Sequence, residues 1–258
     1  MRNNSTSSRS ALSPTSWPPK AWPVGGILLV ALGVLVLYVI APFIYLSIAA
    51  RLHVVDLRHP LANAQQLVIA QLFGYAPVAL FLGLVLPRLA RVTRAELGIR
   101  KPALRDLQTG VLGTIVMWLV VTFASAIIFS ITKRHDTENA IALLQQMKTP
   151  LDKIGFFILA CILAPMIEEL IFRVFLFNAL TRYASIAVAI VVSGLVFGIV
   201  HALGAASAQL VTVSIPLALG GMVLAFVYAR TRNYWANVTT HGLFNSISVI
   251  AIFVFHAK

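Results

Sequence analysis

The chain alternates between long apolar runs and short polar segments. Stretches of twenty or more residues with little or no charge recur from residue 23 to residue 256. Inside a bilayer the backbone N–H and C=O groups cannot bond to water, so runs of this length are typical of membrane-spanning helices. The alternating polarity of membrane strands is absent from the sequence. The pattern predicts seven spans, at 23–50, 62–87, 108–131, 154–181, 184–203, 208–229 and 235–256.

The predicted fold is therefore an all-α membrane protein, a polytopic bundle of about seven helices, or eight if a long run hides one more. The uncharged run 184–229 is too long for one helix, and its small and polar residues 204–209 are the expected turn. The polar residues 1–22 are expected to be a disordered tail. Transmembrane helices follow at 23–131, then a connector at 132–153 in which 136–150 can form a surface helix ended by Pro150, and last the helices of 154–256.

Composition agrees with this pattern, and charge adds an orientation. The chain is 59% hydrophobic and 11% charged, whereas soluble domains average about 45–50% apolar and about 25% charged residues. The net charge of +12 does not indicate a nucleic-acid partner, because almost all Lys and Arg lie between the spans. Counted by alternate sides, 12 lie on the side of the N-terminus and 7 on the other. The positive-inside rule then predicts a cytoplasmic N-terminus.

Two acidic residues lie where water would not solvate them. Glu168 and Glu169 are adjacent in the middle of the fourth span, where a carboxylate costs roughly 2.5–3.5 kcal/mol on insertion scales. Glu169 and Arg173 are four residues apart, the spacing of an ion pair on one helix face, whereas Glu168 is rotated by about 100° and is free to meet another partner. The other six acidic residues lie between spans and are expected to be solvated: Asp56, Glu96, Asp106, Asp136, Glu138 and Asp152.

Two histidines and an asparagine also fall inside the spans. His201 lies near the end of the fifth span, and His241 lies early in the seventh, with Asn245 one turn later on the same face. Each of them alone can be a packing residue that bonds to a neighbouring helix. Together with Glu168 they form a set that can activate water and stabilise an oxyanion.

These residues occur in three short motifs that resemble those of the CPBP family. This family contains type II CAAX prenyl endopeptidases and bacteriocin-processing or immunity-type membrane proteins of bacteria. The motifs follow one another in order within residues 153–250, as Glu168-Glu169-x-x-x-Arg173, Phe197-x-x-x-His201 and His241-x-x-x-Asn245. The resemblance implies a helical bundle that encloses an active-site cavity within the membrane. It also implies an integral, multi-pass protein of a bacterial cytoplasmic membrane.

The resemblance also implies a role for each residue. Glu168 and His201 would position and deprotonate the attacking water. His241 and Asn245 would stabilise the tetrahedral oxyanion. The residues that would support the site are Glu169, Arg173 and Phe197. Glu169 and Arg173 are expected to hold Glu168 in place.

A metal is the alternative chemistry for the same residues. The family is commonly labelled as metalloproteases, and Glu168, His201 and His241 could form a zinc site with one open position. The chain lacks His-Glu-x-x-His, however, and the candidate ligands come from different helices. A Glu/His pair can act on water directly as a general base. We therefore expect no cofactor, with zinc as the alternative.

The sequence thus predicts an intramembrane endopeptidase. Its partners would be the lipid bilayer and a membrane-embedded or lipidated peptide or protein, prenylated CAAX-type substrates included, and no nucleic acid. Two alternatives stay open. One is a non-catalytic immunity or scaffold protein that keeps the fold. The other is a proton-coupled transporter with Glu168, His201 and His241 as a relay, in which Pro165 and Pro216 would break two spans, although no matching halves are found.

Overall fold

The computed structural model of the chain describes residues 23–55, 64–134, 147, 149–203 and 207–255. In these residues the chain forms seven helical rods and no strand. Six rods are long and apolar enough to cross a membrane, and the seventh, Ile186–His201, has 16 residues. The predicted polytopic helical membrane fold is confirmed. The predicted disordered tail, nearly all of the predicted surface helix and the first half of the predicted 204–209 turn lie outside the described residues, and residues 207–209 already belong to a helix.

The rods follow the predicted spans within a few residues. The first rod is α1 (Val24–Arg51), and the second joins α2 (Ala64–Leu80), the π-helical turn η2 (Phe81–Val85) and α3 (Leu86–Ala90). The third is α4 (Leu104–Thr132). The fourth joins α6 (Pro150–Ile158), η3 (Leu159–Leu163), α7 (Ala164–Glu169), η4 (Leu170–Phe177) and α8 (Asn178–Leu180). The last three are α9 (Ile186–His201), α10 (Ser207–Thr231) and α11 (Tyr234–Phe255).

The fourth rod begins earlier than hydropathy predicts because polar residues cap it. Pro150, expected to end a surface helix, instead occupies the first turn of α6. The Thr149 hydroxyl accepts from the Asp152 N–H at 3.2 Å, and the Asp152 carboxylate accepts from the Thr149 N–H at 3.1 Å. Such a capping box satisfies backbone donors that the helix leaves open, so the helix extends into polar sequence.

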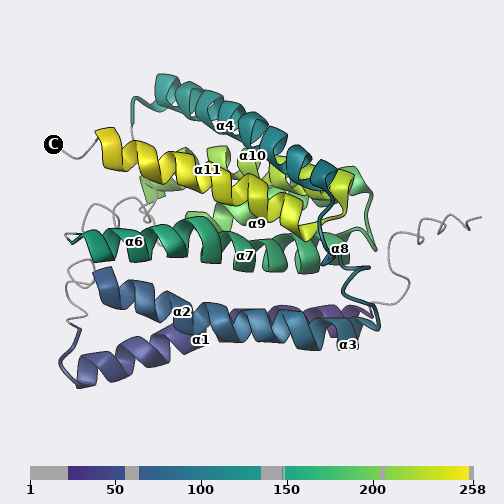
Figure 1. Ribbon diagram of the computed structural model, residues 1–258, viewed down its shortest axis with the longest axis horizontal. Coiled ribbons are helices and arrows are strands. Elements are labelled where there is room, and N and C mark those ends of the chain that lie inside the picture. Colours follow the sequence, from purple (N-terminus) through teal and green to yellow (C-terminus); the bar gives the residue numbers. More distant parts are fainter. Residues whose placement is uncertain (1–22, 56–63, 135–146, 148, 204–206, 256–258) are drawn as a thin grey trace, which may run out of the picture.

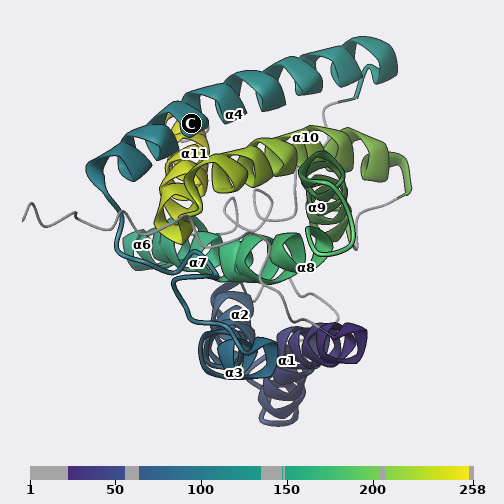
Figure 2. The same cartoon turned by 90° about the vertical axis from the view of Figure 1, so that its right-hand side faces the viewer.

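The fourth rod lies in the middle of the bundle. The hairpin of α1 with α2 and α3 packs on one side of it, and α9, α10, α11 and α4 lie on the other (Figures 1 and 2). The helix that carries Glu168 and Glu169, α7, contacts both α2 and α11. The acidic pair therefore lies inside the bundle.

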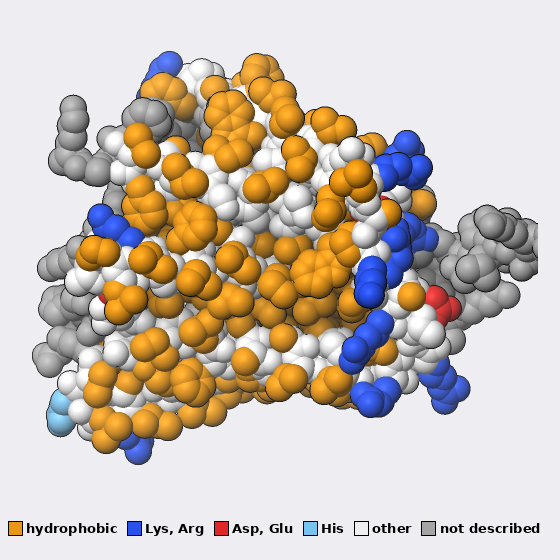
Figure 3. Space-filling view, viewed as in Figure 1, with side chains coloured by type: hydrophobic (Ala, Val, Ile, Leu, Met, Phe, Trp, Pro, Cys, Tyr) orange, Lys and Arg blue, Asp and Glu red, His pale blue; other side chains and the backbone are white. Residues whose placement is uncertain are grey.

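The two ends of the bundle differ in charge. One end holds the start of α1, the α3–α4 loop, the α8–α9 turn and the α10–α11 turn (Figure 1), as the sequence predicts. Figure 3 shows Lys and Arg gathered in a band at this end. The described basic residues there are Arg88, Arg91, Arg94, Arg100, Lys101, Arg105, Arg182, Arg230 and Arg232. That this end faces the cytoplasm stays a prediction.

Asp106 is not solvated between spans as expected. It is buried, with 7% of its surface exposed, and caps α4 by accepting from the Ala103 N–H at 2.9 Å. Its carboxylate also pairs with Arg100 at 3.0 Å and accepts from Asn233 at 3.1 Å. Arg100 donates to the Thr231 carbonyl at 3.0 Å. The basic loop before α4 is thus tied to the turn between α10 and α11.

Pro165 and Pro216, the two prolines that could break spans, have different effects. Pro165 has no N–H, and its ring would clash with the carbonyl four residues earlier, at Cys161. The residues just before it, Leu159–Leu163, form the wider π-helical turn η3. Pro216 lies inside the continuous helix α10, so the expectation that it breaks a span is wrong.

Helices α9 and α10 approach closely through small residues. A Cβ atom on Gly198 would lie 2.3 Å from the Ser214 carbonyl oxygen, and one on Gly194 would lie 2.8 Å from that of Ala218. Glycine at these positions lets the two backbones touch, as is common between helices in membranes. This contact positions the end of α9, where His201 lies.

Candidate active site

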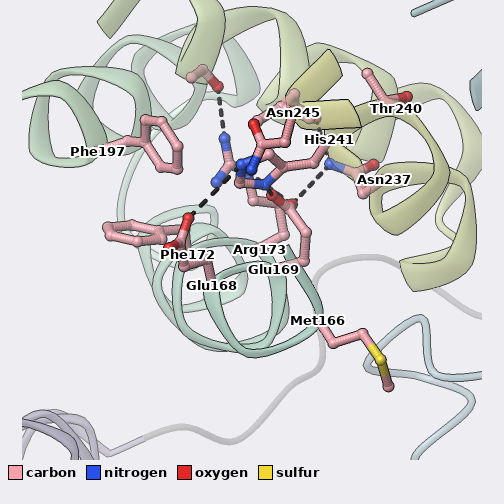
Figure 4. Close-up of polar contacts among 12 residues, drawn as sticks. Met166, Glu168, Glu169, Phe172, Arg173, Phe197, Asn237, Thr240, His241 and Asn245 are labelled. Atoms are coloured by element: carbon pink, nitrogen blue, oxygen red, sulfur yellow. Dashed lines mark hydrogen bonds and ion pairs between the residues drawn. The ribbon is translucent and has the colours of Figure 1, made fainter. Parts of the chain in front are cut away.

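Glu168, His201 and His241 meet inside the bundle, from three different helices. The Oε2 atom of Glu168 lies 3.5 Å from Nε2 of His201 and 3.6 Å from Nε2 of His241 (Figure 4 shows the surrounding contacts). The side chains are 11%, 15% and 3% exposed, in that order. The structure therefore brings together three of the four residues predicted to be catalytic.

The Nδ1 atoms of both histidines already have partners. Nδ1 of His201 lies 2.8 Å from the Phe197 carbonyl oxygen, and a carbonyl only accepts, so this nitrogen carries a proton. Nδ1 of His241 lies 2.9 Å from Oε1 of Glu169 and donates to that carboxylate. Both Nε2 atoms therefore face Glu168 with a lone pair or a second proton.

Glu169 contacts His241 rather than the adjacent Glu168. The predicted ion pair with Arg173 is formed, with 3.2 Å between Oε2 and Nε, and both side chains are fully buried. The same oxygen accepts from Asn237 at 3.0 Å, while Oε1 accepts from His241 (Figure 4). That Glu169 and Arg173 hold Glu168 in place stays a prediction, and the structure adds that Glu169 orients His241. The rotation of about 100° between adjacent helical residues turns Glu169 toward α11.

Phe197, predicted to support the site, contacts both histidines. Its ring centroid lies 4.1 Å from that of His201 and 5.6 Å from that of His241. The guanidinium of Arg173 lies 5.0 Å from the same ring, and Phe172 packs edge-on against it at 5.1 Å. The ring therefore fixes the histidines while its face stabilises a buried cation.

Asn237 is a site residue that the sequence prediction missed. It lies one turn before His241, is fully buried, and donates to the Leu224 carbonyl at 2.7 Å as well as to Glu169. It joins α10, α11 and the acidic pair. The sequence did contain an indication of this role. Asn237 is an amide inside a predicted span, four residues from His241, and polar residues in spans often bond to neighbouring helices.

Asn245 lies one turn beyond His241 and bonds to backbone in this structure. Its Nδ2 donates at 2.8 Å to the carbonyl of Ala160, in the π-helical turn η3. Gly242 allows this approach, because a Cβ atom there would lie 2.8 Å from the Cys161 carbonyl oxygen. An amide nitrogen carries two N–H groups, so this bond leaves a second one for a substrate carbonyl.

The zinc alternative requires three ligands around one point. Among the described residues, no group of three or more His, Cys, Asp and Glu side chains is arranged to hold a metal ion. Zinc held by Glu168, His201 and His241 stays the alternative to the metal-free chemistry.

A cavity around the site, which the family resemblance implies, stays a prediction. One surface hollow of the described residues lies between the start of α1 and α3 and is lined by apolar residues such as Val30 and Leu86. None of its lining residues belongs to the cluster around Glu168.

Comparison with known proteins agrees with the motifs. Residues 150–247 match the family described as "Type II CAAX prenyl endopeptidase Rce1-like". This range runs from the start of α6 into α11 and contains all seven predicted site residues. No solved structure matches the chain.

A curated relative is similar over a longer part of the chain. "Putative membrane peptidase YdiL" of Bacillus subtilis (strain 168) is 30% identical over 165 residues, which are 59% of this chain and 62% of the relative. The chain thus spans less than two thirds of the relative's length. With the family match and the three motifs, this similarity confirms the resemblance. Residues 150–247, which carry the three motifs, are thus similar to the CPBP family, which contains the type II CAAX prenyl endopeptidases.

Proposed function

We propose that the chain is an intramembrane endopeptidase in which Glu168 and His201 activate water. The observation that carries the proposal is one carboxylate oxygen of Glu168 facing the Nε2 atoms of two histidines from two other helices. Three titratable groups collected inside a membrane protein are costly and are rarely needed for packing alone. A base on water and donors for an oxyanion are what amide hydrolysis requires.

Glu168 and His201 form the proposed general base. A water molecule held against them attacks the substrate carbonyl carbon, and its proton passes to this pair as the new C–O bond forms. The Phe197 carbonyl keeps Nδ1 of His201 occupied, so Nε2 stays turned toward Glu168. When the C–N bond breaks, the pair returns a proton to the leaving nitrogen. The products are a carboxylic acid and an amine.

His241 is the proposed donor to the oxyanion. Because its Nδ1 donates to Glu169, its Nε2 can donate only when the ring carries both protons. Glu169 stabilises this imidazolium, in the way that a buried carboxylate supports a catalytic histidine. Arg173 and Asn237 keep the Glu169 carboxylate fixed. Asn245 would supply the second donor.

The depth of the site fits a substrate in the membrane. Helix α9 has 16 residues, a length of about 24 Å at 1.5 Å per residue. The hydrocarbon core is about 30 Å thick. A helix that starts at the basic end therefore places His201 within the membrane. We propose a membrane-embedded or lipidated peptide as substrate, with prenylated CAAX-type proteins as the class that the family match favours. The proposed setting is a bacterial cytoplasmic membrane with the basic end in the cytoplasm.

Proteomics of cleaved termini tests the proposal and does not require an identified substrate. Membranes that contain the wild-type chain, Glu168→Gln or the control Glu96→Gln are compared for new protein ends. Glu96 is an exposed acid in the basic loop, bonded to Thr93. Cleaved ends that appear with wild type and the control but vanish with Glu168→Gln support the protease.

The other outcomes separate the alternatives. Identical termini in all three membranes, with any protective activity of the chain retained in Glu168→Gln, would favour the scaffold. Identical termini with loss of proton-coupled uptake in Glu168→Gln would favour the transporter.

A further inference from the structure

The basic end of the bundle carries far more positive than negative charge. Its described residues include nine basic side chains and two acidic ones, Glu96 and Asp106. Asp106 is buried and pairs with Arg100 at 3.0 Å. Glu96 accepts from the N–H and the hydroxyl of Thr93 at 2.7 and 2.8 Å. Both acids are therefore engaged near the α3–α4 loop, and the band of Lys and Arg in Figure 3 presents a net positive surface.

The loop that joins α3 to α4 is fixed to the bundle through its backbone. The Leu97 carbonyl accepts from the Tyr228 hydroxyl at 2.7 Å, and the Gly98 carbonyl accepts from the Tyr234 N–H at 2.9 Å. Leu97 is fully buried, and Gly98 has a φ of +77°, a left-handed conformation that glycine adopts at little cost. The loop therefore holds three exposed basic side chains on a fixed frame: Arg91, Arg94 and Lys101.

Exposed apolar side chains lie next to the cations at the ends of spanning helices. Arg105, at the start of α4, follows Leu104, which is 72% exposed. Arg230, near the end of α10, lies 6.0 Å over the ring of Phe226, which is 53% exposed. A phospholipid has the matching chemistry, because its phosphate lies just above its hydrocarbon chains. A soluble acidic partner would leave these apolar side chains uncovered.

We infer that this band of basic residues binds the headgroups of anionic phospholipids in the leaflet around the basic end. Arginine and lysine bind phosphate through charge-assisted hydrogen bonds. Clusters of about four to eight of them beside a spanning helix are typical of contact with anionic lipids. Zwitterionic lipids lack the net charge for this attraction. Such binding requires neither Glu168 nor a substrate, so it is independent of the proposed function.

Spin-labelled lipids measure the preference directly. The full chain is reconstituted in phosphatidylcholine vesicles with a trace of spin-labelled phosphatidylglycerol or spin-labelled phosphatidylcholine. Electron paramagnetic resonance then gives the fraction of each label that the protein immobilises. Both leaflets contain the label, so the orientation of the chain does not affect the result. We expect phosphatidylglycerol to associate at least about twofold more strongly at low salt, and the preference to vanish near 1 M salt, where the Debye length is about 3 Å.

Two matched triple variants locate the preference. The first changes three exposed cations of the basic end, as Arg94→Gln, Lys101→Gln and Arg105→Gln. The control changes three exposed cations of the opposite end, as Arg51→Gln, Lys133→Gln and Lys153→Gln. We expect the first variant to associate equally with both lipids and the control to keep the preference of wild type. Thermal unfolding in detergent checks that both variants are folded.

Three outcomes would overturn the inference. The first is equal association of the two lipids with wild type. The second is a preference that the basic-end variant keeps. The third is an equal loss in both triple variants, which would show an effect of net charge alone. Polyglutamate tests the other kind of partner, because a chain that retains it in phosphatidylcholine vesicles without preferring phosphatidylglycerol has a docking surface for acidic proteins instead.

Discussion

Nδ1 of His241 lies 2.9 Å from Oε1 of Glu169, so the second glutamate of the acidic pair orients a histidine on another helix. Glu168 faces the opposite nitrogen of the same ring, with 3.6 Å between Oε2 and Nε2. The two adjacent carboxylates thus act on one imidazole from its two nitrogens. Glu169 has an arginine and an amide as further partners, while Glu168 has histidines, which can exchange protons. This difference leads to distinct expectations for the two acids.

Glu169→Gln should destabilise the protein more than Glu168→Gln. Loss of the Glu169 charge leaves Arg173 fully buried without the carboxylate that it pairs with. Breaking a buried ion pair in this way costs about 3–5 kcal/mol. Glu168 lies beside two histidines of other helices, and these can lose their protons. Thermal unfolding of both variants in the same detergent measures the difference. Equal unfolding temperatures would contradict the assigned roles.

Removal of both members of the ion pair should cost less than removal of one. In Glu169→Gln with Arg173→Met no charge stays buried, and the apolar side chain can fill the space beside Phe197. We expect the double variant to unfold at a higher temperature than Glu169→Gln alone, yet to have low activity because His241 has lost its carboxylate. A double variant less stable than either single one would show that the pair is not the main contact of these residues.

Asn237→Ala should lower kcat about tenfold while leaving the chain folded. The amide fixes Glu169, which in turn fixes His241, and a hydrogen bond to a charged group is worth about 1.5–3 kcal/mol. Thr240→Val is the matched control, because the Thr240 hydroxyl is equally buried near His241 but bonds to the Gly110 carbonyl of α4. If both variants lose the same activity, the effect comes from helix packing and Asn237 has no special role.

Gly198→Ala should reduce activity by displacing His201. The new Cβ atom would lie 2.3 Å from the Ser214 carbonyl oxygen, so α9 must move away from α10, and overpacking of this kind typically costs about 1–3 kcal/mol. Gly155→Ala, at a helical glycine with open space around it, should leave activity and stability near wild type. Activity and unfolding temperature are measured for both. A Gly198→Ala protein with wild-type values would mean that the α9–α10 contact does not set the position of His201.

Removal of metal ions should leave proteolysis intact. The proposed chemistry uses Glu168 and His201 on water, so the purified chain should cleave its substrate after treatment with a chelator and without stoichiometric zinc. Elemental analysis of the purified protein and an assay before and after chelation test this. Loss of activity that zinc alone restores would establish the metal alternative.

The helices and the ion pair could be predicted because their causes are local. Apolar runs long enough to span a bilayer determine the rods, and Glu169 pairs with Arg173 because four residues bring side chains together on one helix face. The helix ends were less predictable. The capping residues Thr149 and Asp152 lengthen α6 into sequence that hydropathy counts as a loop.

The partners of each polar residue depend on packing between helices. Asp106 reads as a solvated loop acid, yet it is buried because Asn233, distant in sequence, folds against it. In the sequence, Asn237 is only one more polar residue inside a span. The packing of α10 and α7 against α11 gives it its partners, the Leu224 carbonyl and Glu169. Such contacts depend on how each rod is rotated and how deep it lies relative to its neighbours. The spacing of residues within one helix does not determine either.

The sequence by itself determined that the chain spans a membrane as helices, that its basic loops share one side, and that costly polar groups gather in its later spans. The reason is that the bilayer leaves a buried backbone or charge few alternatives. Only the tertiary structure decided which groups meet. It turned Glu168 toward both histidines and Glu169 toward one of them. The glycines between α9 and α10 and the rotation of each rod set these contacts, and both act between helices.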